Sequence, residues 1–199
     1  MVAGRKKAFD EKIALQAAMD LFWQKGYIGA SLSELTQRMG INKPSMYSTF
    51  GNKEQLFIKA TKLYIEDKSN AHLKLLSEPN EALKIRLKNY MMSVVSAQCE
   101  SDLPKGCYIS LCQSEAAGGD MPEQASHLLS EAGNQMQAAL TGIFTEEQEA
   151  QSLGLNDNAK KNALCITTVL KGTASMARIG ETPSELEYVV DNCLKGMGL

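Results

Sequence analysis

The sequence predicts an all-α protein in which an N-terminal helix-turn-helix domain precedes a larger helical domain. Helix-start signals recur along the chain, and apolar residues repeat at helical spacing between them. No stretch between turn signals alternates apolar and polar residues over the length of a strand. We expect about nine helices, with one domain over residues 1–52 and a second over residues 53–199.

Residues 31–55 contain three helix starts in close succession. The spacing of Ser31 and Glu34 is typical of a capping box, in which the first side chain binds a free amide of the helix start and the second reaches back. Asn42 follows a glycine-containing turn and can cap a second helix that has a proline in its first turn. The segment 52–55 repeats the capping box for a third helix. Two short helices across a tight turn form the unit that inserts its second helix into the DNA major groove.

The remainder of the first domain is predicted to be one helix with an apolar stripe, over residues 10–25, that ends at Gly26. Residues 10–50 would bury too little surface to be stable alone. We therefore expect the helix that opens at Lys53, and runs to about Ser77, to be shared with the second domain.

The second domain is predicted to contain further helices after a break at residues 79–81. Their expected ranges are 83–99, 107–117, 122–144, 159–179 and from 183 onward. The segments 120–123 and 182–185 each combine capping-box spacing with an early proline.

The last two helices have apolar faces, and the first of them also carries small residues that permit close helix packing. They can pack within the chain or form a four-helix interface with a second copy. We favour a homodimer, because one recognition helix contacts few base pairs whereas a two-fold pair reads two half-sites.

Charge is divided unevenly along the chain. Residues 1–60 contain nine Lys and Arg against five Asp and Glu, net +4, and the rest contains twelve against eighteen, net −6. A basic module attached to an acidic body is expected when the first part alone meets phosphates. The basic run 5–7 is either a solvated terminus or an arm that reaches a minor groove.

Composition argues against membrane and secreted classes. No apolar run is long enough to span a bilayer, and no apolar region of a signal peptide follows the basic start, so we expect a cytoplasmic protein. Cysteines are odd in number, which favours reduced thiols over a disulfide framework; they are Cys99, Cys107, Cys112, Cys165 and Cys193.

The N-terminal residues resemble the TetR/AcrR family of one-component transcriptional regulators. The resemblance covers the whole architecture, and its specific part lies within residues 13–57. The residues that carry it are Leu21-Phe22, Gly26-Tyr27, Ser31, Leu35, Gly40-Ile41, Lys43-Pro44-Ser45-Met46-Tyr47, Phe50, Asn52-Lys53-Glu54 and Leu56-Phe57.

The resemblance implies DNA-contacting roles for a defined set of side chains. The first turn of the recognition helix would face base edges, and Tyr47 and Lys53 would contact phosphates, although Tyr47 could instead be a core residue. Ser48 and Thr49 replace the His-Tyr pair common in the family and leave less aromatic surface for the DNA backbone. The full predicted set is Ser31, Ser33, Asn42, Lys43, Pro44, Ser45, Tyr47, Ser48, Thr49 and Lys53.

The family pattern also implies an effector pocket in the second domain, whose occupation changes the spacing of the two recognition helices. Plain core packing is the alternative for each candidate ligand-binding residue. These candidates are Tyr90, Met91, Tyr108, Leu111, Cys112, Met136 and Leu170.

Cys107 and Cys112 suggest a second hypothesis, because a cysteine near a helix start and a lysine can have a lowered pKa. They would then sense an oxidant or electrophile. Burial as small apolar residues is the simpler interpretation.

Other functions find little support in the sequence. The two histidines, His72 and His127, have no motif partner, and neither a phosphate-binding loop nor a zinc spacing is present. We expect no enzyme, metal or cofactor. An adaptor that does not bind DNA is the remaining alternative, and the retained Lys43, Tyr47 and Lys53 argue against it. The sequence thus predicts a repressor that binds a palindromic double-stranded DNA operator and is released by a small-molecule effector.

Overall fold

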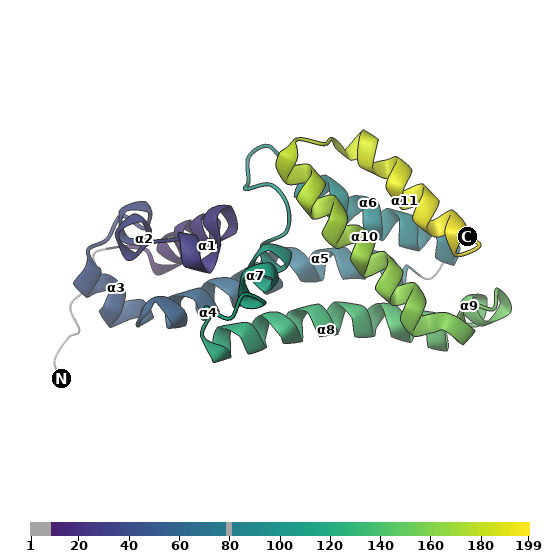
Figure 1. Cartoon of the computed structure of the whole chain (residues 1–199), viewed down its shortest axis with the longest axis horizontal. Helices are drawn as coiled ribbons and strands as arrows, with labels where there is room; N and C mark the ends of the chain where they lie inside the picture. Colours follow the sequence, from purple (N-terminus) through teal and green to yellow (C-terminus); the bar gives the residue numbers. More distant parts are fainter. Residues whose placement is uncertain (1–8, 79–80) are drawn as a thin grey trace.

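A computed structural model describes residues 9–78 and 81–199, and these residues contain helices and no strand. The molecule is elongated, with α2 and α3 at one end and α9 and α11 toward the other (Figure 1). The all-α fold class is confirmed. The α-helices are α1 (Glu11–Gly29), α2 (Leu32–Arg38), α3 (Lys43–Phe50), α4 (Lys53–Tyr64), α5 (Asn70–Leu73), α6 (Leu83–Gln98), α7 (Tyr108–Ala116), α8 (Glu123–Glu146), α9 (Gln148–Ser152), α10 (Ala159–Ile179) and α11 (Pro183–Gly196).

Four predicted helix starts are present with their capping hydrogen bonds. Complete capping boxes open α2, α4 and α11, from Ser31, Asn52 and Thr182 respectively. At α3 the Ser45 amide donates to Asn42 Oδ1 at 2.8 Å. Because each cap satisfies amides that the helix itself cannot, the local sequence determines where these helices begin.

The predicted capping box at residues 120–123 is wrong. Pro122 occupies the N-cap position of α8 with an extended ψ of 144°, and no side chain caps the helix there. A box would have required Pro122 inside the first turn. The chain instead enters the helix one residue later.

The helix predicted from Lys53 to about Ser77 is regular only as far as Tyr64. A π-helical turn (Ile65–Ser69), α5 and a 3₁₀ turn (Lys74–Ser77) follow it. Pro79 and Asn80, which belong to the predicted break, lie outside the described residues. Between α8 and α10, the short helix α9 and a 3₁₀ turn (Asn156–Asn158) lie outside the helix ranges that the sequence predicted.

Two apolar cores hold the fold together. The first joins α1 to α4 with α7 and the start of α8, and it contains Phe22, Phe57 and Tyr108. The second joins α6, the end of α8, α10 and α11. Ile13, which we predicted within the apolar stripe of α1, is exposed. Since α7 belongs to the first core and follows residue 53, the two predicted domains share buried surface.

Hydrogen bonds join α1 to helices much later in the sequence. The Tyr27 amide donates to Glu115 Oε2 of α7 at 2.7 Å, and Arg178 Nη2 of α10 donates to the Trp23 carbonyl at 2.6 Å. Gly26, between them, has φ +77°, and a Cβ atom there would lie 2.2 Å from the Glu115 carboxylate. Glycine is therefore required at this crossing both for its backbone angle and for space.

Removal of the α11 cap should destabilise the protein. Thr182→Ala removes the acceptor of the Glu185 amide and should lower the free energy of unfolding by about 1 kcal/mol, as measured by chemical denaturation. Ser184→Ala, an exposed change in the same turn, is the matched control and should have little effect. Equal losses in the two variants would contradict a capping role for Thr182.

Candidate nucleic-acid interface and ligand cavity

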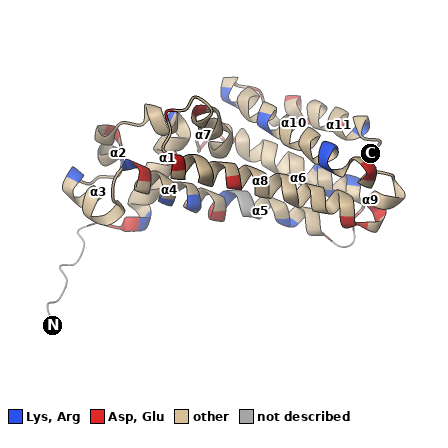
Figure 2. Ribbon diagram, turned by 60° about the horizontal axis from the view of Figure 1, so that its bottom comes forward, with Lys and Arg blue, Asp and Glu red and all other residues tan. Residues whose placement is uncertain are grey.

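Helix α3 lies at one end of the molecule and presents its polar side to solvent. Met46 and Phe50 are buried, whereas Lys43, Pro44 and Ser48 are exposed. Lys43 is the one basic residue of α3 and lies at its first position, where the helix dipole also favours anions (Figure 2). The helix can therefore enter a groove without losing its packing against the protein.

Tyr47 extends from the same exposed side of α3, with 48% of its surface accessible. A core role, the alternative that the sequence left open, does not fit this exposure. An exposed tyrosine in a recognition helix can donate its hydroxyl to a phosphate oxygen.

Several predicted DNA-contacting groups already make hydrogen bonds within the protein. The hydroxyl of Ser31 belongs to the α2 capping box, and Asn42 caps α3. Ser48 Oγ donates to the Ser45 carbonyl at 3.1 Å. Ser33 is exposed, and Ser45 and Thr49 are half-buried. The bonds of Ser31 and Asn42 fix the starts of α2 and α3.

Lys53 is packed more closely than Lys43. Its Nζ lies 4.5 Å from the centroid of the Tyr27 ring, and partial burial lowers the pKa of Lys53 while the charge of Glu115 opposes that shift. Tyr27 in turn donates its amide to Glu115. Lys53 therefore connects the candidate phosphate-binding surface with the contact between α1 and α7.

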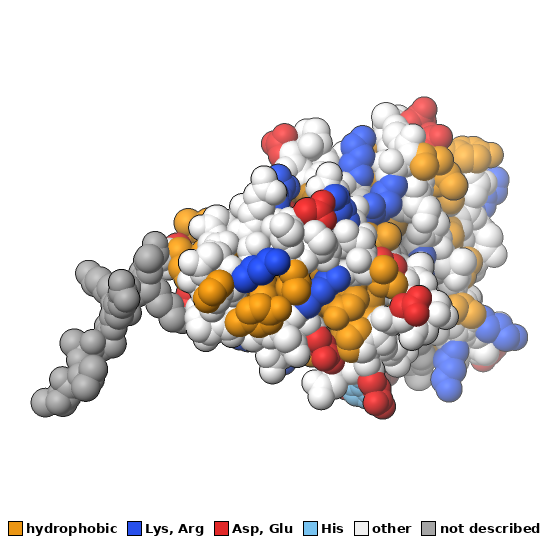
Figure 3. Space-filling view, turned by 60° about the vertical axis from the view of Figure 1, so that its left-hand side comes forward, with side chains coloured by type: hydrophobic (Ala, Val, Ile, Leu, Met, Phe, Trp, Pro, Cys, Tyr) orange, Lys and Arg blue, Asp and Glu red, His pale blue; other side chains and the backbone are white. Residues whose placement is uncertain are grey.

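Other charges near α2 and α3 have structural partners. Lys25 pairs with Glu34, and this contact, with hydrogen bonds from Ser31, lowers the pKa of Glu34 to about 2. Lys59 Nζ donates to the Thr49 carbonyl at 3.2 Å at the end of α3. On the face toward this end, Lys and Arg side chains are interspersed with hydrophobic side chains (Figure 3). The basic run 5–7 lies outside the described residues.

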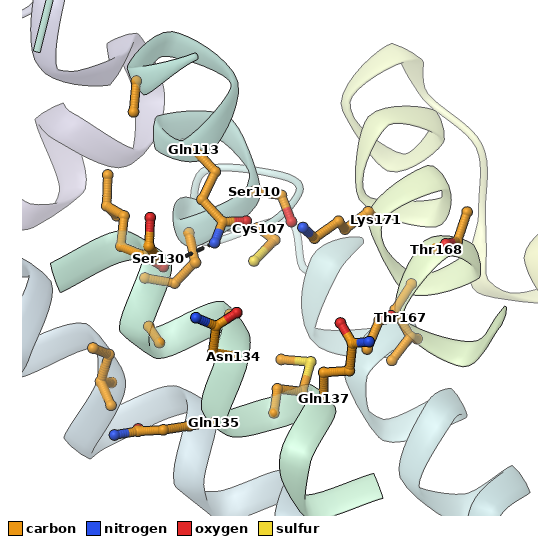
Figure 4. A pocket seen from close by; sticks show the side chains of 18 of the residues that line it. Cys107, Ser110, Gln113, Ser130, Asn134, Gln135, Gln137, Thr167, Thr168 and Lys171 are labelled. Atoms are coloured by element: carbon orange, nitrogen blue, oxygen red, sulfur yellow. Dashed lines mark hydrogen bonds between the residues drawn. The ribbon is translucent and has the colours of Figure 1, made fainter. Parts of the chain in front are cut away.

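A cavity of about 550 Å³ lies between α7, α8 and α10. Its walls combine aliphatic side chains with amides and hydroxyls, and Cys107, Gln113, Asn134, Gln137 and Lys171 surround the same space (Figure 4). A mainly apolar pocket with a few polar groups is the usual form of a small-molecule site, and this volume is within the usual range.

The predicted ligand-binding residues are divided between cavities and core. Met136 and Leu170 line the large cavity, Leu111 lines a neighbouring one of about 410 Å³, and Tyr90 lines a smaller one of about 60 Å³. Three candidates are fully buried and line none of these cavities; they are Met91, Tyr108 and Cys112.

The sequence interpretation missed the polar lining of the large cavity. Gln113, Asn134 and Gln137 lie on amphipathic helices, where an amide is ordinarily taken to face solvent. A polar residue that faces an internal cavity has the same sequence pattern as one that faces water. For the same reason, the sequence pattern could not distinguish Lys171, which also lines the cavity, from a lysine that faces only solvent.

The two candidate reactive cysteines occupy different environments. Cys107 is half-buried, lines all three cavities, and accepts a hydrogen bond from the Tyr64 hydroxyl at 3.8 Å. Cys112 is fully buried, and burial raises the pKa of its thiol well above the ordinary value. A molecule in the cavities can therefore reach Cys107, whereas burial opposes a thiolate at Cys112.

Clusters of potential metal ligands and membrane-spanning helices were both sought in the described ranges. No three His, Cys, Asp or Glu side chains in residues 9–78 and 81–199 are grouped so that they could hold a metal ion. The same ranges contain no helix that is long and apolar enough to cross a bilayer.

Comparison with known proteins identifies the class. Residues 14–60 match the family described as bacterial regulatory proteins, tetR family. The chain is 29% identical over 183 residues to the uncharacterized HTH-type transcriptional regulator YezE of Bacillus subtilis, covering 88% of this chain and 93% of YezE. It is 28% identical over 193 residues to the HTH-type transcriptional repressor ComR of Escherichia coli, covering 96% of this chain and 90% of ComR.

Solved structures agree with these relatives. A cysteine mutant of the TetR family transcriptional regulator CifR, complexed with a 26-bp double-strand operator DNA, has a TM-score of 0.83 and 28% identity, covering 96% of this chain and 98% of that one. The chain is therefore similar over nearly its whole length to TetR-family transcriptional regulators, and residues 14–60 match the model of that family. It is a DNA-binding regulator and not an enzyme.

The geometry divides the predicted contacts into two kinds. Lys53→Met keeps the side-chain stem over Tyr27 but removes the charge, so it should weaken binding to all DNA sequences and reduce the slope of log affinity against log salt by about 1. Ser45→Ala should instead change the preference at one position of each half-site. Fluorescence anisotropy over a salt series with operator variants measures both effects.

Lys62→Met, an exposed change on α4, is the matched control for Lys53→Met and should leave affinity and salt slope unchanged. If Lys53→Met and Ser45→Ala alter binding in the same way, the division between phosphate and base contacts is wrong.

Proposed function

We propose that the protein is a ligand-responsive repressor that binds a palindromic operator as a homodimer and is released when a small molecule occupies the large cavity. The observation that carries this proposal is the double role of α7. One side of α7 lines the cavity, and the other packs on the helices that position α3.

Individual contacts support a mechanical connection through α7. On the cavity side, Gln113 Nε2 donates to the Leu129 carbonyl of α8 at 2.8 Å. On the other side, Glu115 accepts the Tyr27 amide of α1, and the Tyr108 hydroxyl shares a 2.9 Å hydrogen bond with Thr61 of α4. A ligand that separates α7 from α8 would therefore displace α1 and α4 together. Release requires that the ligand bind the displaced arrangement more tightly than the DNA-binding one.

The outer surface of α10 and α11 supports a homodimer. Ile179 and Tyr188 are 76% and 74% exposed, and Met176 and Val189 are also largely exposed. The opposite sides of these helices are buried against α6 and against each other. Apolar side chains on two adjacent helices suit a four-helix interface with a second copy.

Repression is the direction favoured by the relatives. ComR, which is similar over nearly the whole chain, is named a transcriptional repressor. The adaptor alternative is disfavoured by the exposed Lys43 and Tyr47, which a protein that does not contact DNA would not need on α3.

Operator binding tests the proposed function directly. The purified chain should bind a palindromic site near its own gene specifically, with a steep negative slope of log affinity against log salt. An electrophoretic mobility assay against shuffled DNA of equal length measures specificity. Absent binding, or equal binding to shuffled DNA, would refute the proposal.

The proposed dimer interface predicts a change in oligomeric state that can be measured independently of DNA binding. Tyr188→Asp places a charge in the apolar face and should convert the dimer to monomers, lowering operator affinity by a factor on the order of 100 or more because one half-site contact is lost. Analytical ultracentrifugation measures the oligomeric state. Leu153→Asp, an exposed apolar position after α9, is the control and should remain dimeric; a dimeric Tyr188→Asp variant would place the interface elsewhere.

A second candidate function is favoured by the position of Cys107. Because its thiol lines the cavities, an electrophile could add to its thiolate and thereby act as the effector. N-ethylmaleimide should then release operator DNA from the wild type and from Cys165→Ser, which alters an exposed cysteine, but not from Cys107→Ser. Unchanged release from Cys107→Ser would eliminate this function, as measured in the mobility assay.

A further inference from the structure

The small cavity of about 60 Å³ lies where α1, α4 and α6 meet. Trp23 from α1 and Tyr90 from α6 both line it, and they are only 3% and 1% exposed. The Trp23 and Tyr64 rings meet edge to face with centroids 5.1 Å apart. The cavity thus has aromatic walls that belong to both halves of the chain.

Two polar atoms of this cavity lack a partner. Trp23 Nε1 and the Tyr90 hydroxyl are buried and have no hydrogen-bond partner within the described residues. A buried polar group without a partner is costly, and proteins generally satisfy such groups. Both residues line the same small cavity, which is therefore where a partner for these groups is sought.

The small cavity adjoins the large one, because the two share lining residues. Val94, Gln98, Cys107 and Met136 line both. Gln98 is already satisfied, since its amide donates to the Leu170 carbonyl at 3.0 Å and accepts from Thr173 at 2.8 Å. Among the residues that line the small cavity, the unpartnered side-chain groups are those of Trp23 and Tyr90.

The charges around the small cavity do not favour a charged ligand. Lys68 and Glu100 line it with one charge of each sign, and burial lowers the pKa of His72. Burial also raises the pKa of Tyr90, which keeps that hydroxyl protonated. An ion placed between a neutral indole and a neutral phenol would lose hydration without a dedicated counter-charge.

We propose that the small cavity is the head-group subsite of the effector: the ligand has an aliphatic body in the large cavity and a neutral carbonyl or hydroxyl oxygen that binds Trp23 Nε1 and the Tyr90 hydroxyl. This inference rests on the proposed function of the large cavity. The subsite connects α1 with α6 directly, and the Trp23 carbonyl is held by Arg178 of α10. A ligand bound there contacts the DNA-binding helices themselves as well as α7.

The single tryptophan of the chain makes the subsite observable. Emission from Trp23 is followed while 2-octanone, 1-octanol or octanoate is titrated, and dissociation constants are taken from the titrations. We expect 2-octanone and 1-octanol to change Trp23 emission and to bind more tightly than octanoate. Tighter binding of octanoate would overturn the neutral head group, and no change with any probe would overturn the subsite and indicate that buried water alone satisfies the two groups.

Tyr90→Phe tests the hydrogen bond without removing a contact of the ligand-free protein. Because the Tyr90 hydroxyl has no partner there, the variant should fold normally and bind 2-octanone about three- to tenfold more weakly. Tyr188→Phe is the matched control: it removes the hydroxyl of an exposed tyrosine on α11 that lines none of the three cavities. Its affinity for 2-octanone should match the wild type, and equal affinities of wild type and Tyr90→Phe would overturn the proposal.

Operator binding is measured in parallel with probe binding, so that failure of the subsite can be distinguished from failure of the proposed function. A chain that binds its operator but does not bind these probes refutes the subsite alone. A chain that binds the probes but no operator refutes the proposed function and leaves the subsite intact.

Discussion

The crossing of α1 and α7 is the constraint on which the rest of the structure depends. The Tyr27 amide is held by Glu115 at 2.7 Å, and only glycine at position 26 leaves room for that carboxylate. Lys53 lies over the Tyr27 ring on the same side. As a result, the helix-turn-helix unit is held by a helix that also forms a wall of the large cavity.

This arrangement explains why the DNA-binding helices are not an independent unit. Their core includes Tyr108 and Cys112 of α7 and Leu129 of α8, so a large part of their buried surface comes from beyond residue 53. Closely packed interiors transmit displacement because they have little free volume to absorb it. Under the proposed function, stability and signal transmission thus rely on the same buried contacts.

Residues that line a cavity and residues that belong to the core can be close neighbours in the sequence. Cys107 and Cys112 are five residues apart, yet one lines every cavity described and the other is fully buried. Tyr90 and Met91 are adjacent, and only Tyr90 lines a cavity. Residue type could not show which member of each pair lines a cavity, because both members are compatible with a buried core position. The direction of the side chain from its helix decides which of them a ligand can reach.

The sequence alone determined the helix starts and the exposed recognition helix, because capping and periodicity are local properties that depend on residues within one or two turns. It failed at Pro122, which takes the N-cap position two residues after Asp120, where the capping-box spacing places the N-cap. The tertiary structure decided what local patterns cannot specify: the burial of Lys53 over Tyr27, the amides that face the cavity, and the unpartnered Trp23 and Tyr90. These features arise from helices far apart in the sequence, and their separation in space is determined only when the whole core is packed.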